Sequence, residues 1–330
     1  MNWRLTFLIV GCLAAIWALL SIGGFPVATV FKDMVFGSFG NVKIFSKTLR
    51  EVAPLLIAGT AVFVGLRAGL FNIGVEGQYT VGALACAAVA VWIPGPVGIV
   101  LGTICGMIVG ALWAFPAAWI KAYRNGHEVI TTIMLNNIAT FATTALVAGP
   151  LKDPASDNTS TASIPMMLPS LTKKPEITIA LMVGVTLVTL LWYWIKRTVA
   201  GYELEAVGAN PSAAEMAGIA VRRVTISAML ASGAIAGLAG ALQVLVVEGR
   251  FYKDFAQGYG FDSLGVALLA GGNPLGLIPS AFAFGAIKKG ASFITVEHGV
   301  PKGMTLIILG FSIVVFAAMR YRKQAMRVSQ

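Results

Sequence analysis

The sequence predicts an all-α, polytopic membrane protein with about ten transmembrane segments. Of its 330 residues, 57% are hydrophobic and only 12% are charged, and the mean hydropathy is +0.83. A soluble protein carries roughly twice that charged fraction. Apolar segments recur from one end of the chain to the other, which leaves no room for a sizeable water-soluble domain. We therefore expect residues 1–330 to form a single transmembrane domain.

The predicted spans follow from the ~20 apolar residues that a helix needs to cross the hydrocarbon core. In chain order they lie near 5–31, 52–66, 79–93, 97–119, 128–149, 176–195, 225–247, 259–272, 274–290 and 303–320. The first is interpreted as a retained span, because no small-residue cleavage site follows a short apolar core. The segment GGNP at 271–274 is either a tight turn between two spans or a break within one.

Basic residues predict the orientation, because cytoplasmic loops are enriched in Lys and Arg. An even number of spans puts both termini on one side. The loop at 196–224, the pair Lys121 and Arg124, and the tail at 320–330 then lie in the cytoplasm, and the polar stretch at 150–175 lies outside. The basic residues that disagree are Lys32, Lys43, Lys47, Arg50, Lys288, Lys289 and Lys302. The prediction is a multi-pass protein of the cytoplasmic (inner) membrane with both termini in the cytoplasm.

Small residues recur at four-residue spacing inside two of the predicted spans. Gly102, Gly106 and Gly110 lie in one, and Gly233 and Gly237 lie in another. Such spacing lets helix backbones approach closely in lipid, where packing replaces the hydrophobic effect between helices. We expect these two spans to be part of a tightly packed helical core.

Motifs for ATP binding or catalysis are absent from the sequence. It contains no GxxxxGK[ST] phosphate loop, no GxSxG nucleophile elbow, no HExxH and no CxxC, and each of its two histidines is alone in a predicted loop. Cys12, Cys86 and Cys105 lack metal-ligand spacing. We expect no catalytic residues, no metal site and no cofactor on this chain. Transport is then the default function, driven by an ion gradient or by a separate ATPase.

The loop at 196–224 bears on the energy source. Asn210-Pro211-Ser212 can start a short helix, because Pro suits the first turn and Asn or Ser can cap its free N–H groups. That helix, PSAAEMAGI, should end near Gly218. It is either an ordinary interfacial connector or a docking helix that fits a groove on a motor subunit.

The same loop resembles the coupling-helix segment of ABC importer permeases of the sugar and nucleoside branch, whose pattern is similar to AVGxNxxAAxxAGI. The matching residues are Ala206-Val207-Gly208, Asn210, Ala213-Ala214 and Ala217-Gly218-Ile219. GLFNIGVEGQ at 69–78 and HEVITTIMLN at 127–136 resemble the nucleoside side of that branch. SGAIAGLAGA at 232–241 and GYGFDSLGVALLAGGNPLG at 258–276 are similar to the same family.

This resemblance implies a permease subunit of an ATP-driven importer for nucleosides, with an ABC importer type II-like fold. The chain would not be an enzyme, and ATP would be used by a partner subunit. The family implies two permease subunits, two cytoplasmic ATPases and an extracytoplasmic binding protein, in many members a lipoprotein. HEVITTIMLN resembles one of two permease types found together, which favours a non-identical sister chain over a homodimer.

The resemblance also assigns candidate residues for coupling. Those expected to contact the ATPase are Gly208, Asn210, Ala213, Ala214, Glu215 and Gly218. Small side chains would let the helix sit deep in a groove, so we expect Ala214→Trp to leave expression intact and to uncouple ATP hydrolysis from uptake. Two alternatives stay open: a permease of the same fold for a simple sugar such as ribose, and an ion-coupled secondary carrier. A carrier needs an intramembrane carboxylate, for which Glu76 is the candidate, and it would stop when the proton gradient is collapsed.

The stretch 66–84, LRAGLFNIGVEGQYTVGAL, interrupts apolar sequence with polar residues and glycines. Unpaired amides and an ionised carboxylate are costly in hydrocarbon, so they must face protein or a water-filled path. Glu76 is expected to accept backbone N–H groups at the next helix start and to fix a break in the helix. In the alternative reading these residues line the substrate pathway: Asn72 and Gln78 offer donors and acceptors to a passing nucleoside, Glu76 lies beside them, and Asn136 and Asn137 supply the opposite wall. We expect Asn72→Ala or Asn136→Ala to change which nucleosides are taken up.

Overall fold

A computed structural model describes residues 3–301, 303–304, 306–311 and 314–315. These residues are predominantly helical, and the only β-pairing among them consists of two isolated bridges. They fall into two compact units, one containing residues up to 52, 172–176 and residues from 282 on, and the other 53–171 and 177–281. The predicted tail at 320–330 and Lys302 lie outside the described residues.

The first unit contains α1 (Trp3–Ile22), α2 (Val27–Phe39), the start of α3 (Val42–Arg67) and most of α12 (Leu277–His298). The span predicted at 5–31 is two helices, because Gly24 has a φ of 77° and Pro26 cannot donate to a continuing helix. α1 and α2 meet at 109°. His298 is not alone, since its Nε2 lies 2.7 Å from Asp33 Oδ2.

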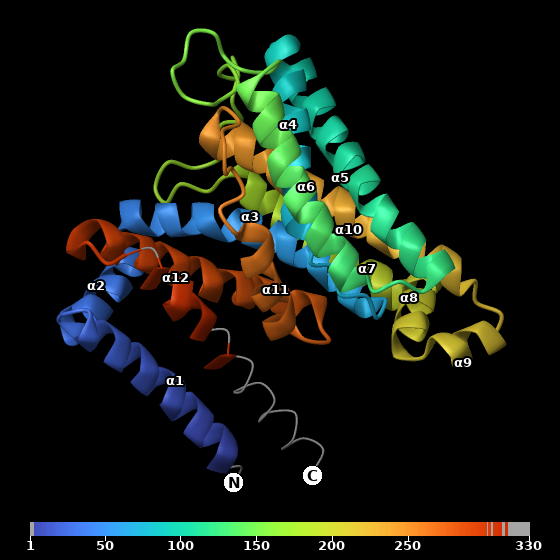
Figure 1. Ribbon diagram of the computed structural model, residues 1–330, viewed down its shortest axis with the longest axis horizontal. Coiled ribbons are helices and arrows are strands. Elements are labelled where there is room, and N and C mark those ends of the chain that lie inside the picture. The colour runs from blue at the N-terminus through green and yellow to red at the C-terminus, as the bar shows by residue number, and fades with distance from the viewer. Residues whose placement is uncertain (1–2, 302, 305, 312–313, 316–330) are drawn as a thin grey trace. The chain divides into compact units, whose positions relative to one another are not determined.

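The second unit contains most of the helices labelled in Figure 1. Its helices are the rest of α3, α4 (Val75–Trp92), α5 (Pro96–Arg124), α6 (Glu128–Ala148), α7 (Ile179–Arg197), α8 (Val199–Ala209), α9 (Pro211–Met216), α10 (Val221–Gln243) and α11 (Tyr259–Ala270). A π-helical turn, Val244–Glu248, extends α10, and a 3₁₀ turn, Pro274–Gly276, precedes α12.

Helices α4, α5 and α10 form the closely packed centre of the second unit. A Cβ added to Gly237 would lie 2.2 Å from the Gly106 carbonyl oxygen, and one added to Gly110 would lie 2.4 Å from the Gly233 carbonyl oxygen. Only glycine fits at such backbone contacts. The expected close packing of the two glycine-spaced spans is confirmed.

The prediction of about ten spans is not confirmed. Five helices of the described chain are long and apolar enough to cross a membrane (α3, α5, α6, α7 and α10 with its π turn), or six if α1 and α2 make one bent span. α11 has 12 residues, so its length of about 18 Å is too short for a hydrocarbon core of about 30 Å. GGNP separates α11 from α12, with Gly271 at a φ of 65°.

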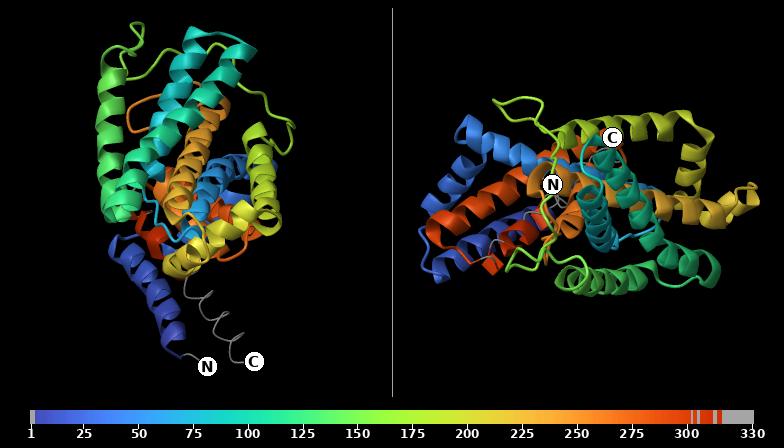
Figure 2. Two further views of the ribbon diagram at one scale, coloured as in Figure 1. Left: turned by 90° about the vertical axis from the view of Figure 1, so that its right-hand side faces the viewer. Right: turned by 90° about the horizontal axis from the view of Figure 1, so that it is seen from above.

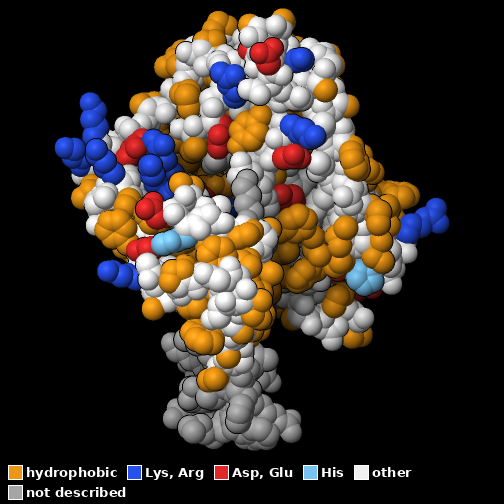
Figure 3. Space-filling view, turned by 60° about the vertical axis from the view of Figure 1, so that its left-hand side comes forward, with side chains coloured by type: hydrophobic (Ala, Val, Ile, Leu, Met, Phe, Trp, Pro, Cys, Tyr) orange, Lys and Arg blue, Asp and Glu red, His pale blue; other side chains and the backbone are white. Residues whose placement is uncertain are grey.

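Apolar side chains form several patches on the visible face of a space-filling view, between charged side chains (Figure 3). On α5, the exposed side chains include Ile104, Ile108 and Leu112, and Phe141 on α6 is 74% exposed. A water-soluble surface does not carry continuous apolar faces of this kind. They fit a chain surrounded by lipid.

The polar connection at 150–175 is irregular, as predicted, and its middle is fastened to the segment that follows α10. The Thr161 N–H donates to the Phe251 carbonyl at 2.8 Å, and the Lys253 N–H donates to the Thr159 carbonyl at 3.1 Å. Two views show this connection at one end of the second unit and α8–α9 at the other (Figures 1 and 2). The helical core lies between these two ends.

Candidate functional site

The polar stretch after α3 is a true break in the helical backbone. α3 ends at Arg67, Gly69 adopts a left-handed φ of 72°, and helix resumes with α4 at Val75. A residue with a Cβ is strained at such a φ, so glycine allows the turn. The break leaves backbone polar groups that need partners inside a membrane protein.

Asn72 and Gln78 supply those partners to each other and to their surroundings. The Asn72 Nδ2 donates to Gln78 Oε1 at 3.0 Å and to Ser232 Oγ at 2.9 Å, and its Oδ1 accepts the Gly74 N–H at 2.9 Å. Asn72 is fully buried and Gln78 is 1% exposed. In this conformation the two amides are buried in the packing of the break, α4 and α10.

Asn136 and Asn137 lie on different faces of α6. The Asn136 side chain is buried and bridges to the break, accepting the Gly77 N–H and donating to the Ile73 carbonyl, both at 2.9 Å. Asn137 is exposed, and its side chain donates to the Ile133 carbonyl of its own helix at 3.2 Å. The structure therefore joins Asn136 to the Asn72 region and leaves Asn137 apart from it.

Asn136 and Asn137 provide a matched test of the buried hydrogen bonds at the helix break. We expect Asn136→Ala to lower the amount of folded protein, because the Gly77 N–H and the Ile73 carbonyl would be buried without partners, each at a cost of about 1–3 kcal/mol. Asn137→Ala should leave the folded amount unchanged. The measurement is the detergent-extracted, monodisperse protein recovered from membranes. A well-folded Asn136→Ala protein with altered substrate preference would instead place Asn136 on the pathway.

Glu76, in the first turn of α4, caps the start of α11. Its Oε1 accepts the Gly258 N–H at 3.0 Å, and its Oε2 accepts the Gly260 N–H at 2.6 Å. Backbone N–H groups at a helix start have no partners within the helix, and a carboxylate there also faces the favourable end of the helix dipole. The capped helix lies far along the chain from the break, not directly after it. A Cβ on Gly260 would lie 2.4 Å from Glu76 Cα, so the two segments are in backbone contact.

A polar cavity of about 220 Å³ opens beside this cap. Its walls come from the first turns of α4, the second half of α6 and the loop that precedes α11. The lining residues are Glu76, Thr80, Thr140, Thr143, Thr144, Asp254, Phe255, Ala256, Gln257 and Gly258. We call this space the threonine cavity.

The loop side of the threonine cavity has an unusual backbone. Asp254 and Gln257 have φ values of 61° and 46°, a left-handed region that residues other than glycine seldom adopt. The loop is supported by aromatic packing, because the Phe255 ring stacks on Phe251 at 4.9 Å and lies 6.0 Å from Tyr79. Unusual backbone conformations that the surrounding packing holds in place are common at functional sites.

Sequence reasoning missed the threonine cavity, although α6 carries a signal for it. Thr140, Thr143 and Thr144 are spaced i, i+3 and i+4, which puts three hydroxyls on one helix face in an otherwise apolar segment. The Thr143 hydroxyl donates to the Ala139 carbonyl at 2.7 Å, so its oxygen can still accept a hydrogen bond.

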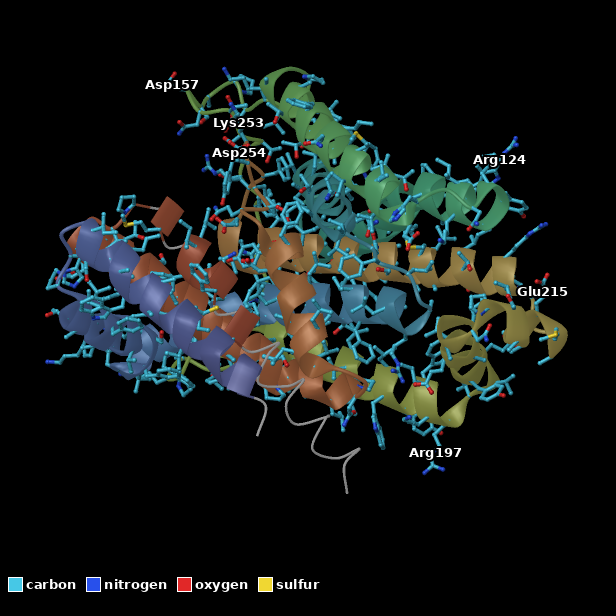
Figure 4. The ribbon with its side chains drawn as sticks, turned by 60° about the horizontal axis from the view of Figure 1, so that its bottom comes forward. Arg124, Asp157, Arg197, Glu215, Lys253 and Asp254 are labelled. Atoms are coloured by element: carbon cyan, nitrogen blue, oxygen red, sulfur yellow. The ribbon has the colours of Figure 1, made fainter. Side chains whose placement is uncertain are left out.

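The α8–α9 segment lies at the end of the second unit opposite the polar connection at 150–175. The predicted short helix is α9, and its predicted cap is confirmed because Asn210 Oδ1 accepts the Ala213 N–H at 3.1 Å. Gly218 ends the turn with a φ of 84°. Arg124, Arg197 and Glu215 lie toward this end, and Asp157, Lys253 and Asp254 lie at the opposite end (Figure 4).

The candidate coupling residues do not share one face. Ala213 and Glu215 are exposed, and Met216 beside them is 84% exposed. Ala214 is buried at 4% and packs in a cluster with Leu204 and Val207. This burial replaces the expectation that Ala214→Trp leaves the protein intact, because the side chain points into the permease itself.

Gly208 also faces inward, against the end of α3. A Cβ there would lie 2.0 Å from the Arg67 carbonyl oxygen and 2.9 Å from the Gly69 nitrogen. An ion pair between Arg67 and Glu205 of α8 strengthens the same contact. The α8–α9 segment is therefore packed directly on the helix break.

Known proteins are similar to this chain over most of its length. The family described as branched-chain amino acid transport system / permease component matches residues 44–317. The guanosine ABC transporter permease protein NupP of Bacillus subtilis is 35% identical, over 96% of this chain and 95% of its own. The nucleoside ABC transporter permease protein NupB of Lactococcus lactis is 30% identical, over 88% and 83%. The glucose ABC transporter permease protein TsgB13 of Haloferax volcanii is 31% identical, over 93% and 84%.

Proposed function

The chain belongs to the family of ABC transporter permease components, and from that membership we propose that it imports nucleosides as the permease subunit of an ATP-driven importer. It is a multi-pass membrane protein and not an enzyme, since its relatives are permease subunits. The observation that carries the nucleoside assignment is the 35% identity to a guanosine permease over nearly the full length of both chains. The glucose relative, at 31%, supports a simple sugar such as ribose as the second candidate.

We propose that substrate passes through the threonine cavity. Hydroxyls of Thr140 and Thr144 and the amide of Gln257 suit the hydroxyl groups of a ribose and the polar edge of a base. The cavity of about 220 Å³ has mixed walls, with Phe255 as an apolar face. In this proposal Asn72, Gln78 and Asn136 hold the wall in place, and Glu76 both caps α11 and borders the path.

An ABC permease subunit works with an ATP-binding subunit and a substrate-binding partner. We propose that the exposed face of α9, with Ala213, Glu215 and Met216, contacts the ATPase, which uses the ATP, and that this chain holds no cofactor of its own.

We also propose a type II-like fold, a non-identical sister permease, a binding lipoprotein on the outside and both termini in the cytoplasm. The grouping of Arg124 and Arg197 at the α9 end supports that orientation (Figure 4).

The experiment is uptake of labelled guanosine, adenosine and uridine by cells that lack other nucleoside uptake systems and express the complete importer. We expect uptake that unlabelled nucleosides inhibit and that excess ribose or glucose leaves unchanged. Uptake should persist when the proton gradient is collapsed and ATP is maintained. Inhibition by the free sugars alone would favour the sugar permease, and loss of uptake with the proton gradient would indicate a carrier.

A further inference from the structure

The side chains that line the threonine cavity include acidic residues and no basic ones among the described residues. Its lining contains the carboxylates of Glu76 and Asp254 and no Lys, Arg or His among the described residues. The other lining groups are neutral hydroxyls, an amide, an aromatic ring and backbone. A recess whose charges have one sign concentrates ions of the opposite sign and repels ions of the same sign.

Glu76 removes the feature that would otherwise attract anions. The start of a helix at the edge of a cavity exposes N–H groups and a positive dipole end, which favours phosphate or carboxylate ligands. Here the Glu76 carboxylate accepts the N–H groups of Gly258 and Gly260. The helix start is therefore filled by an anion that belongs to the protein.

Asp254 adds a carboxylate on the loop wall. Its side chain is exposed and forms no ion pair within the described part of the chain. The basic residues of the same loop, Arg250 and Lys253, line a different cavity with residues 158–160. Arg250 donates to Ser163 Oγ at 2.6 Å. Arg250 and Lys253 thus line a cavity beside the polar connection, and Asp254 lines the threonine cavity.

We propose that the threonine cavity is a charge filter that admits neutral solutes and rejects phosphorylated ones. This inference rests on the proposed function, because it names the substrate class of that same site. A nucleoside is neutral at pH 7, whereas its monophosphate carries a charge of about −1.5 to −2. An acidic lining disfavours such anions in either direction of passage.

The test measures the electrostatic potential of the cavity directly. A cysteine is introduced by Thr144→Cys in the complete importer, and its reaction rates with a cationic, an anionic and a neutral methanethiosulfonate are measured in intact cells and in inverted membrane vesicles. The protein with only its natural Cys12, Cys86 and Cys105 gives the background. The free thiol 2-mercaptoethanol gives the reference ratio of cationic to anionic rates.

We expect the ratio of cationic to anionic rates in the Thr144→Cys protein to exceed the free-thiol ratio by about tenfold or more. Adding Asp254→Asn should lower it several-fold. Asparagine tolerates the left-handed φ of 61° at that position, so this variant is expected to fold. A ratio equal to that of the free thiol, a ratio unchanged by Asp254→Asn, or no reaction with the neutral reagent from either side would overturn the filter.

Nucleoside uptake by the unmodified importer is measured in parallel. Absence of that uptake would refute the proposed function whatever the ratio, and normal uptake with a free-thiol ratio would refute only the charge filter. The two failures are therefore distinguishable.

Discussion

Replacing Glu76 with alanine is expected to remove most of the folded protein from the membrane. The change leaves the Gly258 and Gly260 N–H groups, which now donate to the carboxylate at 3.0 and 2.6 Å, without an acceptor. Hydrogen bonds to a charged group contribute about 1.5–3 kcal/mol each, so the loss is about 3 kcal/mol or more. Marginal native stability makes a loss of that size visible as reduced abundance. The measurement is the amount of monodisperse permease recovered from membranes after mild heating.

Glu76→Gln is the matched control, because it keeps the size and shape of the side chain and removes its charge. Glutamine keeps one oxygen acceptor and places an NH₂ group opposite the second N–H, so we expect an intermediate folded amount. If Glu76→Ala is recovered at the level of the unmodified protein but transports nothing, the carboxylate acts on the pathway and its role as a cap is secondary. If, in addition, uptake by the unmodified protein requires the proton gradient, Glu76 is the ion site of a carrier.

Local features of this chain could be predicted because their causes are local. The Asn210 cap and the Pro211 helix start depend on adjacent residues, and both occur as expected. The break after Arg67 follows from glycines within a few positions. The close approach of Gly106 to Gly237 follows from a four-residue spacing that needs no knowledge of the partner helix.

The remaining features depend on contacts between distant segments. Glu76 was expected to cap a helix start, but nothing in the sequence identifies that start as Gly258–Gly260. The half-length α11 was predicted as a span because apolar composition does not reveal how a helix sits in the fold. Residue type also gave no sign that Ala214 faces inward and Ala213 outward, since both are small and adjacent.

That last difference makes the most direct test of coupling. Ala214→Trp is expected to lower the amount of folded protein strongly, because the side chain is 4% exposed and packs against Leu204 and Val207. An indole has no room there, and overpacking costs about 1–3 kcal/mol or more. Ala213→Trp adds the same group on the exposed face, so its folded amount should equal that of the unmodified protein.

The functional outcomes of the two tryptophan variants should therefore separate. Ala213→Trp is expected to reach the membrane, to lose at least about tenfold in uptake and to leave ATP hydrolysis unresponsive to substrate, because bulk on α9 holds the ATPase away from its contact surface. Uptake per folded molecule, ATP hydrolysis in the reconstituted importer and co-purification of the ATPase are measured together. Normal uptake by a well-folded Ala213→Trp protein would show that the ATPase does not contact this face of α9, and the exposed Met216 would then need another explanation.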